Sequence, residues 1–143
     1  AIGIGMLIRA ALRMRPDRII IGEVRGKEAL ELLQAMNTGH DGSFSTGHAN
    51  SSKDMLLRLE TMVLMAAELP LPAIRSQIAS ALDIMVHVAR VSIEEVYGIE
   101  NGEIILNPLF TYHEGKGLEK TGELTHREKL RLAGYGVCDI LFK

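Results

Sequence analysis

The first half of the chain alternates between helical and strand-like patterns of apolar residues. Residues 5–14 place apolar side chains at helical spacing, and residues 27–37 do so again. Between them, residues 18–24 contain an unbroken apolar run, which is typical of a strand buried on both faces of a parallel sheet. Small residues over 42–50 indicate a second strand and a turn. The order strand–helix–strand over residues 18–48 therefore predicts an α/β unit.

Two further helices are predicted after this unit. Ser51 or Ser52 can cap a helix that runs to about Ala67, with apolar residues at helical spacing. The sequence "LPLP" then breaks the chain, and residues 74–82 return to a helical pattern.

The remainder favours antiparallel strands. Residues 83–91 and 92–100 are strand-like, and Asn-Gly at 101–102 is a strong hairpin signal that leads into a strand over 103–114. The tail from residue 115 is polar, and a short helix is expected over 126–133.

The junction between the first two of these strands lacks turn residues. No Gly, Asn, Asp or Pro separates them, although an antiparallel pair needs at least ~2 residues to reverse the chain. We therefore expect residues to be missing between Arg90 and about Ser92, either as a skipped loop or as a loop that this protein has lost.

Composition and charge narrow the function classes. The 143 residues have a formal net charge of −2, so no general basic field attracts nucleic acid or anionic lipid. The single cysteine, Cys138, rules out an internal disulfide and fits a reducing compartment. No signal peptide is visible, and the longest apolar stretch falls short of the ~18 residues of a membrane span. A soluble cytoplasmic protein is expected.

A carboxylate follows the first apolar strand. In open parallel sheets, ligands bind outside the carboxyl ends of the strands, and Glu23 stands at such an end beside Gly22. His40 and His48 bracket the end of the next strand, so a carboxylate and imidazoles are expected to converge there in a metal–phosphate or hydrolytic site. The alternative is a solvated strand terminus with two histidines that cap backbone groups. Two histidines without a third ligand make a poor zinc site.

Longer motifs carry a family resemblance. "RPDRIIIGEVRG" is similar to the Walker B box of the secretion ATPases of the type II/type IV superfamily, "TGHDGSFSTGHANS" to their His box, and "RLETMVLMAAELPLPAIRSQIASALDIMVHVAR" to the helical region that follows. Over about residues 7–110 the chain most resembles the CpaF/TadA-type ATPases of Flp (Tad) pilus assembly.

The resemblance implies a fold and a division of the chain. The fold class is α/β: the C-terminal part of a RecA-like P-loop NTPase domain, with a partial parallel sheet and helices, followed by helices and a small β-hairpin region. Residues 1–50 would form the C-terminal portion of the ATPase core, 51–90 a helical region that completes it, and 91–143 a hairpin and tail.

The resemblance also implies roles for individual residues. Glu23 would hold Mg²⁺, through water, or polarise the attacking water, and His48 would contact the γ-phosphate side. Arg25 would anchor the Walker B turn. Either Arg9 or Arg13 would reach a phosphate, in the same subunit or across a subunit boundary. The alternative is a solvated helix face. The candidate nucleotide- or phosphate-binding residues are thus Arg9, Arg13, Arg25 and His40.

The implied function is ATP hydrolysis with Mg²⁺ in a hexameric ring that docks on an inner-membrane secretion or pilus platform and takes no nucleic acid. Such an ATPase needs the loop G-x-x-x-x-G-K-[S/T], and no segment of this sequence matches it. The chain is therefore expected to be the C-terminal half of a motor ATPase and to be inactive alone. Apolar surface is expected to be exposed along the edge of the sheet where the missing half of the nucleotide-binding domain would pack. The alternative from another class is a non-catalytic interaction module that joins such a ring.

Overall fold

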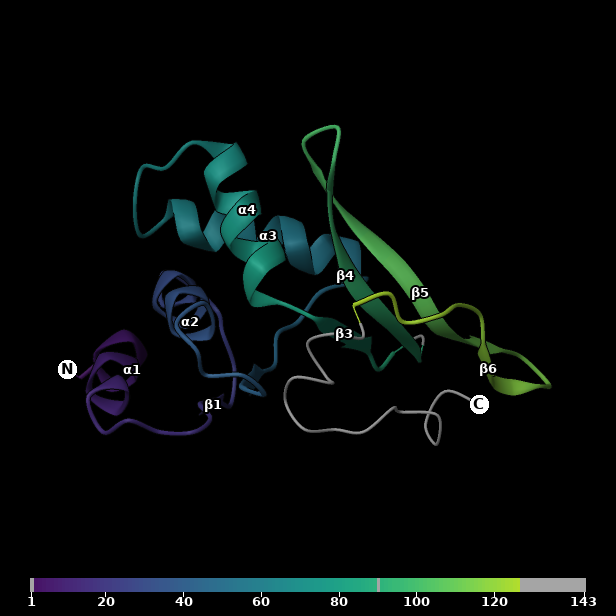
Figure 1. Ribbon diagram of the computed structural model, residues 1–143, viewed down its shortest axis with the longest axis horizontal. Helices are drawn as coiled ribbons and strands as arrows, with labels where there is room; N and C mark the ends of the chain where they lie inside the picture. The colour runs from purple at the N-terminus through teal and green to yellow at the C-terminus, as the bar shows by residue number, and fades with distance from the viewer. Residues whose placement is uncertain (1, 90, 127–143) are drawn as a thin grey trace.

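The computed structural model describes residues 2–89 and 91–126 (Figure 1). Within these ranges the helices are α1 (Ile4–Leu12), α2 (Ala29–Met36), α3 (Ser52–Leu64) and α4 (Leu71–Ala81). The strands are β1 (Ile20–Ile21), β2 (Phe44–Ser45), β3 (Ile84–His87), β4 (Ser92–Glu100), β5 (Glu103–His113) and β6 (Gly117–Lys120). Figure 1 shows α1 and α2 at one end of the molecule and the long β4–β5 hairpin at the other. No helix in the described ranges is both long and apolar enough to cross a membrane.

The predicted strand–helix–strand unit is present. β1 and β2 pair in parallel, with Ile20 opposite Phe44 and Ile21 opposite Ser45, and α2 connects them. The strands are much shorter than the patterns over 18–24 and 42–50 suggested. Two backbone hydrogen bonds extend the pairing: Phe44 N–H donates to the Ile19 carbonyl, and Val24 N–H donates to the Thr46 carbonyl. The α/β fold class is confirmed.

The helices supply most of the core. Each buries one face, as their 3.6-residue patterns predict. The buried residues of this core include Ile8, Leu32, Leu33, Leu59, Val63, Ile74 and Ile78. The predicted cap of α3 is confirmed, because the Ser51 side chain accepts a hydrogen bond from the Asp54 N–H at 3.0 Å. This helix ends at Leu64 rather than at Ala67.

The second half forms a four-stranded antiparallel sheet in the order β3-β4-β5-β6. Asn101 and Gly102 both have positive φ, 51° and 79°, as a two-residue hairpin turn requires, so the Asn-Gly prediction is confirmed. β6 was missed, because its residues lie in a polar segment without a strand pattern. Since β3 pairs with β4, this sheet crosses the domain boundary that we expected at residue 90.

The β3–β4 hairpin forms without Gly, Asn, Asp or Pro between its strands. His87 pairs with Ser92, and Val91 N–H donates to the Val88 carbonyl at 3.3 Å. Val91 takes a positive φ of 44°, which is usually left to glycine or asparagine. The predicted pairing is confirmed, although none of the usual turn residues lies between His87 and Ser92. The predicted gap concerns the Arg90 to Val91 bond, and the predicted helix over 126–133 lies almost wholly beyond residue 126, so both fall outside the described residues.

A buried carboxylate fastens the segment after β6 onto this sheet. Glu95 on β4 is 1% exposed and accepts hydrogen bonds from the N–H groups of Thr125 and His126, at 3.0 and 2.8 Å. The Asn107 side chain donates to it at 2.9 Å, and the Thr125 hydroxyl donates as well. We call this arrangement the Glu95 clasp.

Apolar side chains are exposed around α1 and the small parallel sheet, as expected from the sequence. Ile20 on β1 is 65% exposed and Phe44 on β2 is 56% exposed. On and near α1 the exposed apolar residues are Ile2, Ile4, Met6, Leu7 and Met14. A two-stranded parallel sheet with uncovered apolar residues is unusual, because parallel sheets are normally buried on both faces.

Candidate functional site

Glu23 stands just beyond the carboxyl end of β1, and the backbone on both sides of it is fixed. The Thr46 hydroxyl donates to the Gly22 carbonyl, and the Thr46 carbonyl accepts from the Val24 N–H. A Cβ atom placed on Gly22 would meet no other atom within 4 Å. The strand end is therefore rigid, and the space beside Gly22 is open, as the sequence suggested.

The Glu23 carboxylate is contacted at both oxygens. Arg25 Nη2 lies 2.5 Å from Oε2, and His48 Nε2 lies 3.2 Å from Oε1. The Glu23 side chain is 22% exposed, whereas those of Arg25 and His48 are 75% and 82% exposed. The hydrogen bond from Arg25, with the nearby charges of Arg25, His48 and Arg58, lowers the pKa of Glu23. The structure thus brings Glu23, Arg25 and His48 together around an ionised carboxylate.

Arg25 is held by a residue that the sequence analysis did not single out. Glu28 Oε1 accepts the N–H groups of Arg25 and Gly26 at 2.8 and 3.0 Å, immediately before α2. Burial opposes ionisation of Glu28, but these N–H groups lower its pKa overall. An acidic residue at a helix start, two residues after a glycine, could have signalled this turn.

α3 supports the loop that carries His48. A Cβ atom on Gly47 would lie 2.5 Å from Met55 Cε, so the loop packs directly against a side chain of this helix. Ser51 then caps the helix three residues after His48. Arg58, one of the charges near Glu23, lies farther along the same helix. No sequence motif indicated that it would lie near this carboxylate.

His40 does not join this group. Its Nδ1 lies 3.0 Å from the Ala35 carbonyl, at the end of α2, and its own carbonyl accepts the Ser43 hydroxyl. The Ser43 hydroxyl oxygen in turn accepts the Ile19 N–H, which places this cluster at the amino end of β1. Glu23 lies at the opposite end. The prediction that both histidines converge on the carboxylate is therefore wrong for His40, whose observed contact is a backbone cap.

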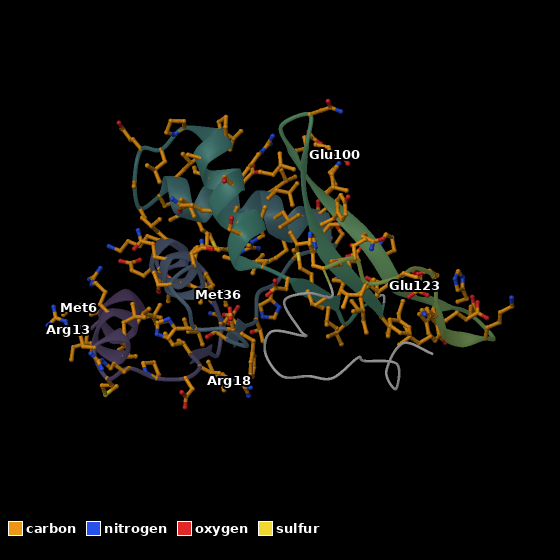
Figure 2. All side chains as sticks on the ribbon, in the orientation of Figure 1. Met6, Arg13, Arg18, Met36, Glu100 and Glu123 are labelled. Carbon is orange, nitrogen blue, oxygen red and sulfur yellow. The ribbon has the colours of Figure 1, made fainter. Side chains whose placement is uncertain are left out.

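Arg9 of α1 and Arg13, which follows that helix, also lie apart from Glu23. Arg9 Nη1 forms an ion pair with Glu31 Oε1 of α2 at 2.6 Å. Arg13 follows the last residue of α1, is exposed, and extends from the outer side of that helix (Figure 2). Neither arginine contacts the carboxylate within the described residues.

A cleft connects α1 with the carboxylate. It has a volume of about 550 Å³ and lies between α1 and β1, where Leu7, Ile8 and Ile20 line its apolar part. Glu23 and Arg25 also line it. Glu23 and Arg25 thus form the charged part of a cleft whose other walls are mainly apolar.

The donor set fits magnesium and phosphate better than zinc. Residues 2–89 and 91–126 contain no group of three or more His, Cys, Asp or Glu side chains that could hold a metal ion by itself. Mg²⁺ needs only one or two carboxylates when phosphates and water complete its shell, and Glu23 can supply one. The Arg25 guanidinium suits a phosphate oxygen.

Comparison with known proteins connects this geometry to one family. Residues 2–115 match the model of the family described as "Type II/IV secretion system protein". The type IV secretion system protein PtlH of Bordetella pertussis is 45% identical over 87 residues, which cover 59% of this chain and 26% of that protein. A Mycobacterium tuberculosis protein (strain CDC 1551 / Oshkosh) named for conjugal transfer is 37% identical over 125 residues, or 84% of this chain and 35% of that protein.

A solved structure agrees with these sequence matches. The VirB11 ATPase from the Brucella suis type IV secretion system, crystallised in complex with sulphate, aligns with a TM-score of 0.60 and 30% identity. The alignment covers 92% of this chain and 34% of that one. The chain therefore spans about a third, or less, of the length of these relatives.

Proposed function

Because the chain belongs to the family of type II/IV secretion system proteins, we propose that it contributes the Walker B and His-box part of a motor ATPase. The protein would hydrolyse ATP with Mg²⁺ to drive protein secretion or pilus assembly. The observation that carries this proposal is the position of Glu23, a half-buried carboxylate at the carboxyl end of β1 that is contacted by Arg25 and His48.

We assign Glu23 the role of binding the Mg²⁺ shell or orienting the attacking water. A carboxylate at this place can hold a water molecule of the Mg²⁺ shell or orient the water that attacks the γ-phosphate. Mg²⁺, when bound, would neutralise charge on the phosphates. His48 is placed to contact the γ-phosphate side, and Arg25 to anchor the turn and offer its guanidinium to phosphate.

The remaining candidates receive smaller roles. Arg13, exposed at the end of α1, is free to meet a phosphate bound to a neighbouring subunit. Arg9 would first have to leave Glu31. We give His40 no direct contact with nucleotide, because its ring caps α2 at the other end of the sheet.

The finer assignment follows the motifs. The Walker B and His-box strings most resemble those of CpaF/TadA-type ATPases, so we propose Flp (Tad) pilus assembly as the pathway. We further propose a hexameric ring on the cytoplasmic side of the inner membrane, bound to a membrane platform protein. The similarity to the VirB11 ATPase supports the motor function. The division of the chain at residues 50 and 90 stays a prediction.

The test is Glu23→Gln in the full-length protein. This substitution keeps the shape of the side chain and removes its charge, so steady-state turnover should fall by about 100-fold or more while nucleotide affinity changes little. Glu68→Gln is the matched control, because Glu68 is an exposed carboxylate on the chain segment that follows α3. Wild-type turnover in the Glu23→Gln protein would refute the assignment of Glu23. An absence of turnover in the full-length wild-type protein would instead favour a non-catalytic module.

A further inference from the structure

The Glu23 carboxylate is shielded on its solvent side by the two side chains that contact it. Arg25 engages Oε2 and His48 engages Oε1, so neither oxygen is left without a nitrogen neighbour. Both shielding side chains are more than three times as exposed as the carboxylate. A ligand that binds either carboxylate oxygen therefore competes with Arg25 or His48.

We propose that Arg25 and His48 lock Glu23, and that a polyphosphate chain unlocks it by drawing both side chains onto its own oxygens. This inference rests on the proposed function and adds an order of events to it. Phosphate arrives before, or together with, the divalent cation, and Glu23 becomes available as a metal or water ligand only then.

The positive charges around Glu23 favour the arrival of phosphate over that of a bare cation. A bare divalent cation that approached Glu23 would have to displace the Arg25 guanidinium, and it would be repelled by that charge and by Arg58. A phosphate chain has the opposite sign, so the same charges attract it. Arg25 forms charge-assisted hydrogen bonds with phosphate at least as readily as with a carboxylate.

The local structure allows Arg25 to move without disturbing the turn. Glu28 holds the backbone N–H groups of Arg25 and Gly26, so the main chain does not depend on the Arg25–Glu23 ion pair. The Arg25 side chain is long and 75% exposed, and no other ion pair involves it within the described residues. The open space beside Gly22 leaves room for a ligand at the same point.

Manganese binding without nucleotide tests the lock directly. The affinity of Mn²⁺ for the full-length protein would be measured by electron paramagnetic resonance for wild type, Glu23→Gln, Arg25→Gln and the double variant. Removing an exposed ion pair should tighten Mn²⁺ binding by about two- to five-fold in Arg25→Gln. The gain should vanish in the double variant, because Glu23 is the ligand that was released.

Nucleotide affinity supplies the second readout. Arg25→Gln should weaken binding of a slowly hydrolysed ATP analogue, whereas a purely structural role would leave the two affinities unchanged or reduce both. Lys116→Gln, which removes one positive charge near the β5–β6 turn, should alter neither. His48→Gln provides an independent variant with the same expected directions, and circular dichroism verifies folding.

Two outcomes overturn the proposal. One is Mn²⁺ affinity in Arg25→Gln and His48→Gln that equals or falls below that of wild type. The other is a gain that persists in the double variant, which would assign the metal to another residue. Either result is separable from failure of the proposed function, because that is decided by the turnover of Glu23→Gln.

Discussion

Glu95 and His126, which lie thirty-one residues apart, are joined twice. The His126 N–H donates to Glu95 Oε1 at 2.8 Å, and His126 Nδ1 lies 3.0 Å from the same oxygen. Burial of Glu95 favours its protonated form, but the hydrogen bonds from Thr125, Asn107 and His126 outweigh this and lower its pKa to about 2. A buried carboxylate therefore fastens the segment after β6 to β4.

Replacing Glu95 with glutamine should destabilise the protein. The amide has one acceptor instead of two charged oxygens, and its NH₂ group would face N–H donors, so about 2–3 kcal/mol of unfolding free energy should be lost. Urea denaturation followed by circular dichroism measures this. Glu100→Gln, an exposed change on the same strand, should cost less than about 0.5 kcal/mol (Figure 2). Equal effects of the two substitutions would contradict the role of the Glu95 clasp.

The same carboxylate should make the protein sensitive to acid. The folded-state pKa of Glu95 is about 2, below its ordinary value of 4.5, so its contribution to stability is fully present above about pH 5. It should be lost as the pH falls from about 5 to about 2. At about 1.4 kcal/mol per pKa unit, the loss amounts to roughly 3 kcal/mol. In Glu95→Gln this part of the dependence should disappear, and an unchanged profile would count against the assignment.

Local patterns predicted the helices and hairpins well, for identifiable reasons. α3 combines a serine cap with apolar residues at helical spacing, and both signals act within one segment. Asn101 and Gly102 tolerate the positive φ that a tight hairpin demands. These preferences depend only on residues that are close together in the sequence, so they can be predicted from it.

Contacts between distant segments could not be predicted in the same way. Glu95 lies in a strand-like stretch as an apparently ordinary charged residue, and its partners come from residues 107–126. His40 precedes β2 and His48 follows it, and the parallel register with β1 places His48, but not His40, at the end of the sheet where Glu23 lies. Glu23 could be predicted because ligands bind outside the carboxyl ends of parallel strands. No comparable rule points to Arg58.

Arg75 links α4 to α3 and to the β4–β5 turn. Its Nε donates to Glu60 Oε1 at 2.7 Å, and its Nη1 donates to the Gly102 carbonyl. Both side chains of the ion pair are largely buried, at 19% and 11% exposure. Arg75→Met should therefore lower the unfolding free energy by about 2–3 kcal/mol, because Glu60 would keep a buried charge without its partner.

A double-mutant cycle isolates this interaction. Glu60→Gln combined with Arg75→Met should cost less than the sum of the single changes, by at least about 1 kcal/mol, because removing both partners leaves no buried unpaired charge. Additive costs in urea denaturation would show that the pair contributes nothing beyond its separate contacts.

Among the described residues of the β3–β4 turn, Val91 has the backbone that best fits glycine. Its φ of 44° lies in the left-handed region, where a β-branched side chain costs about 1–2 kcal/mol. Its side chain is 41% exposed, so little packing is lost when it is removed. Glycine also raises the entropy of the unfolded chain, which offsets part of the gain. Val91→Gly should consequently stabilise the protein by about 0.5–1 kcal/mol.

Ala89→Gly in the same turn is the control. Ala89 is not among the residues with a positive φ in the described ranges, so its backbone does not favour glycine. Glycine should then bring its usual entropic penalty, a loss of about 0.5 kcal/mol, without relief of strain. Opposite signs for the two glycine variants in urea denaturation would establish that the hairpin turns at Val91 with backbone strain. Destabilisation by both would mean that the turn takes a different form, and the pairing of β3 with β4 would then need another explanation.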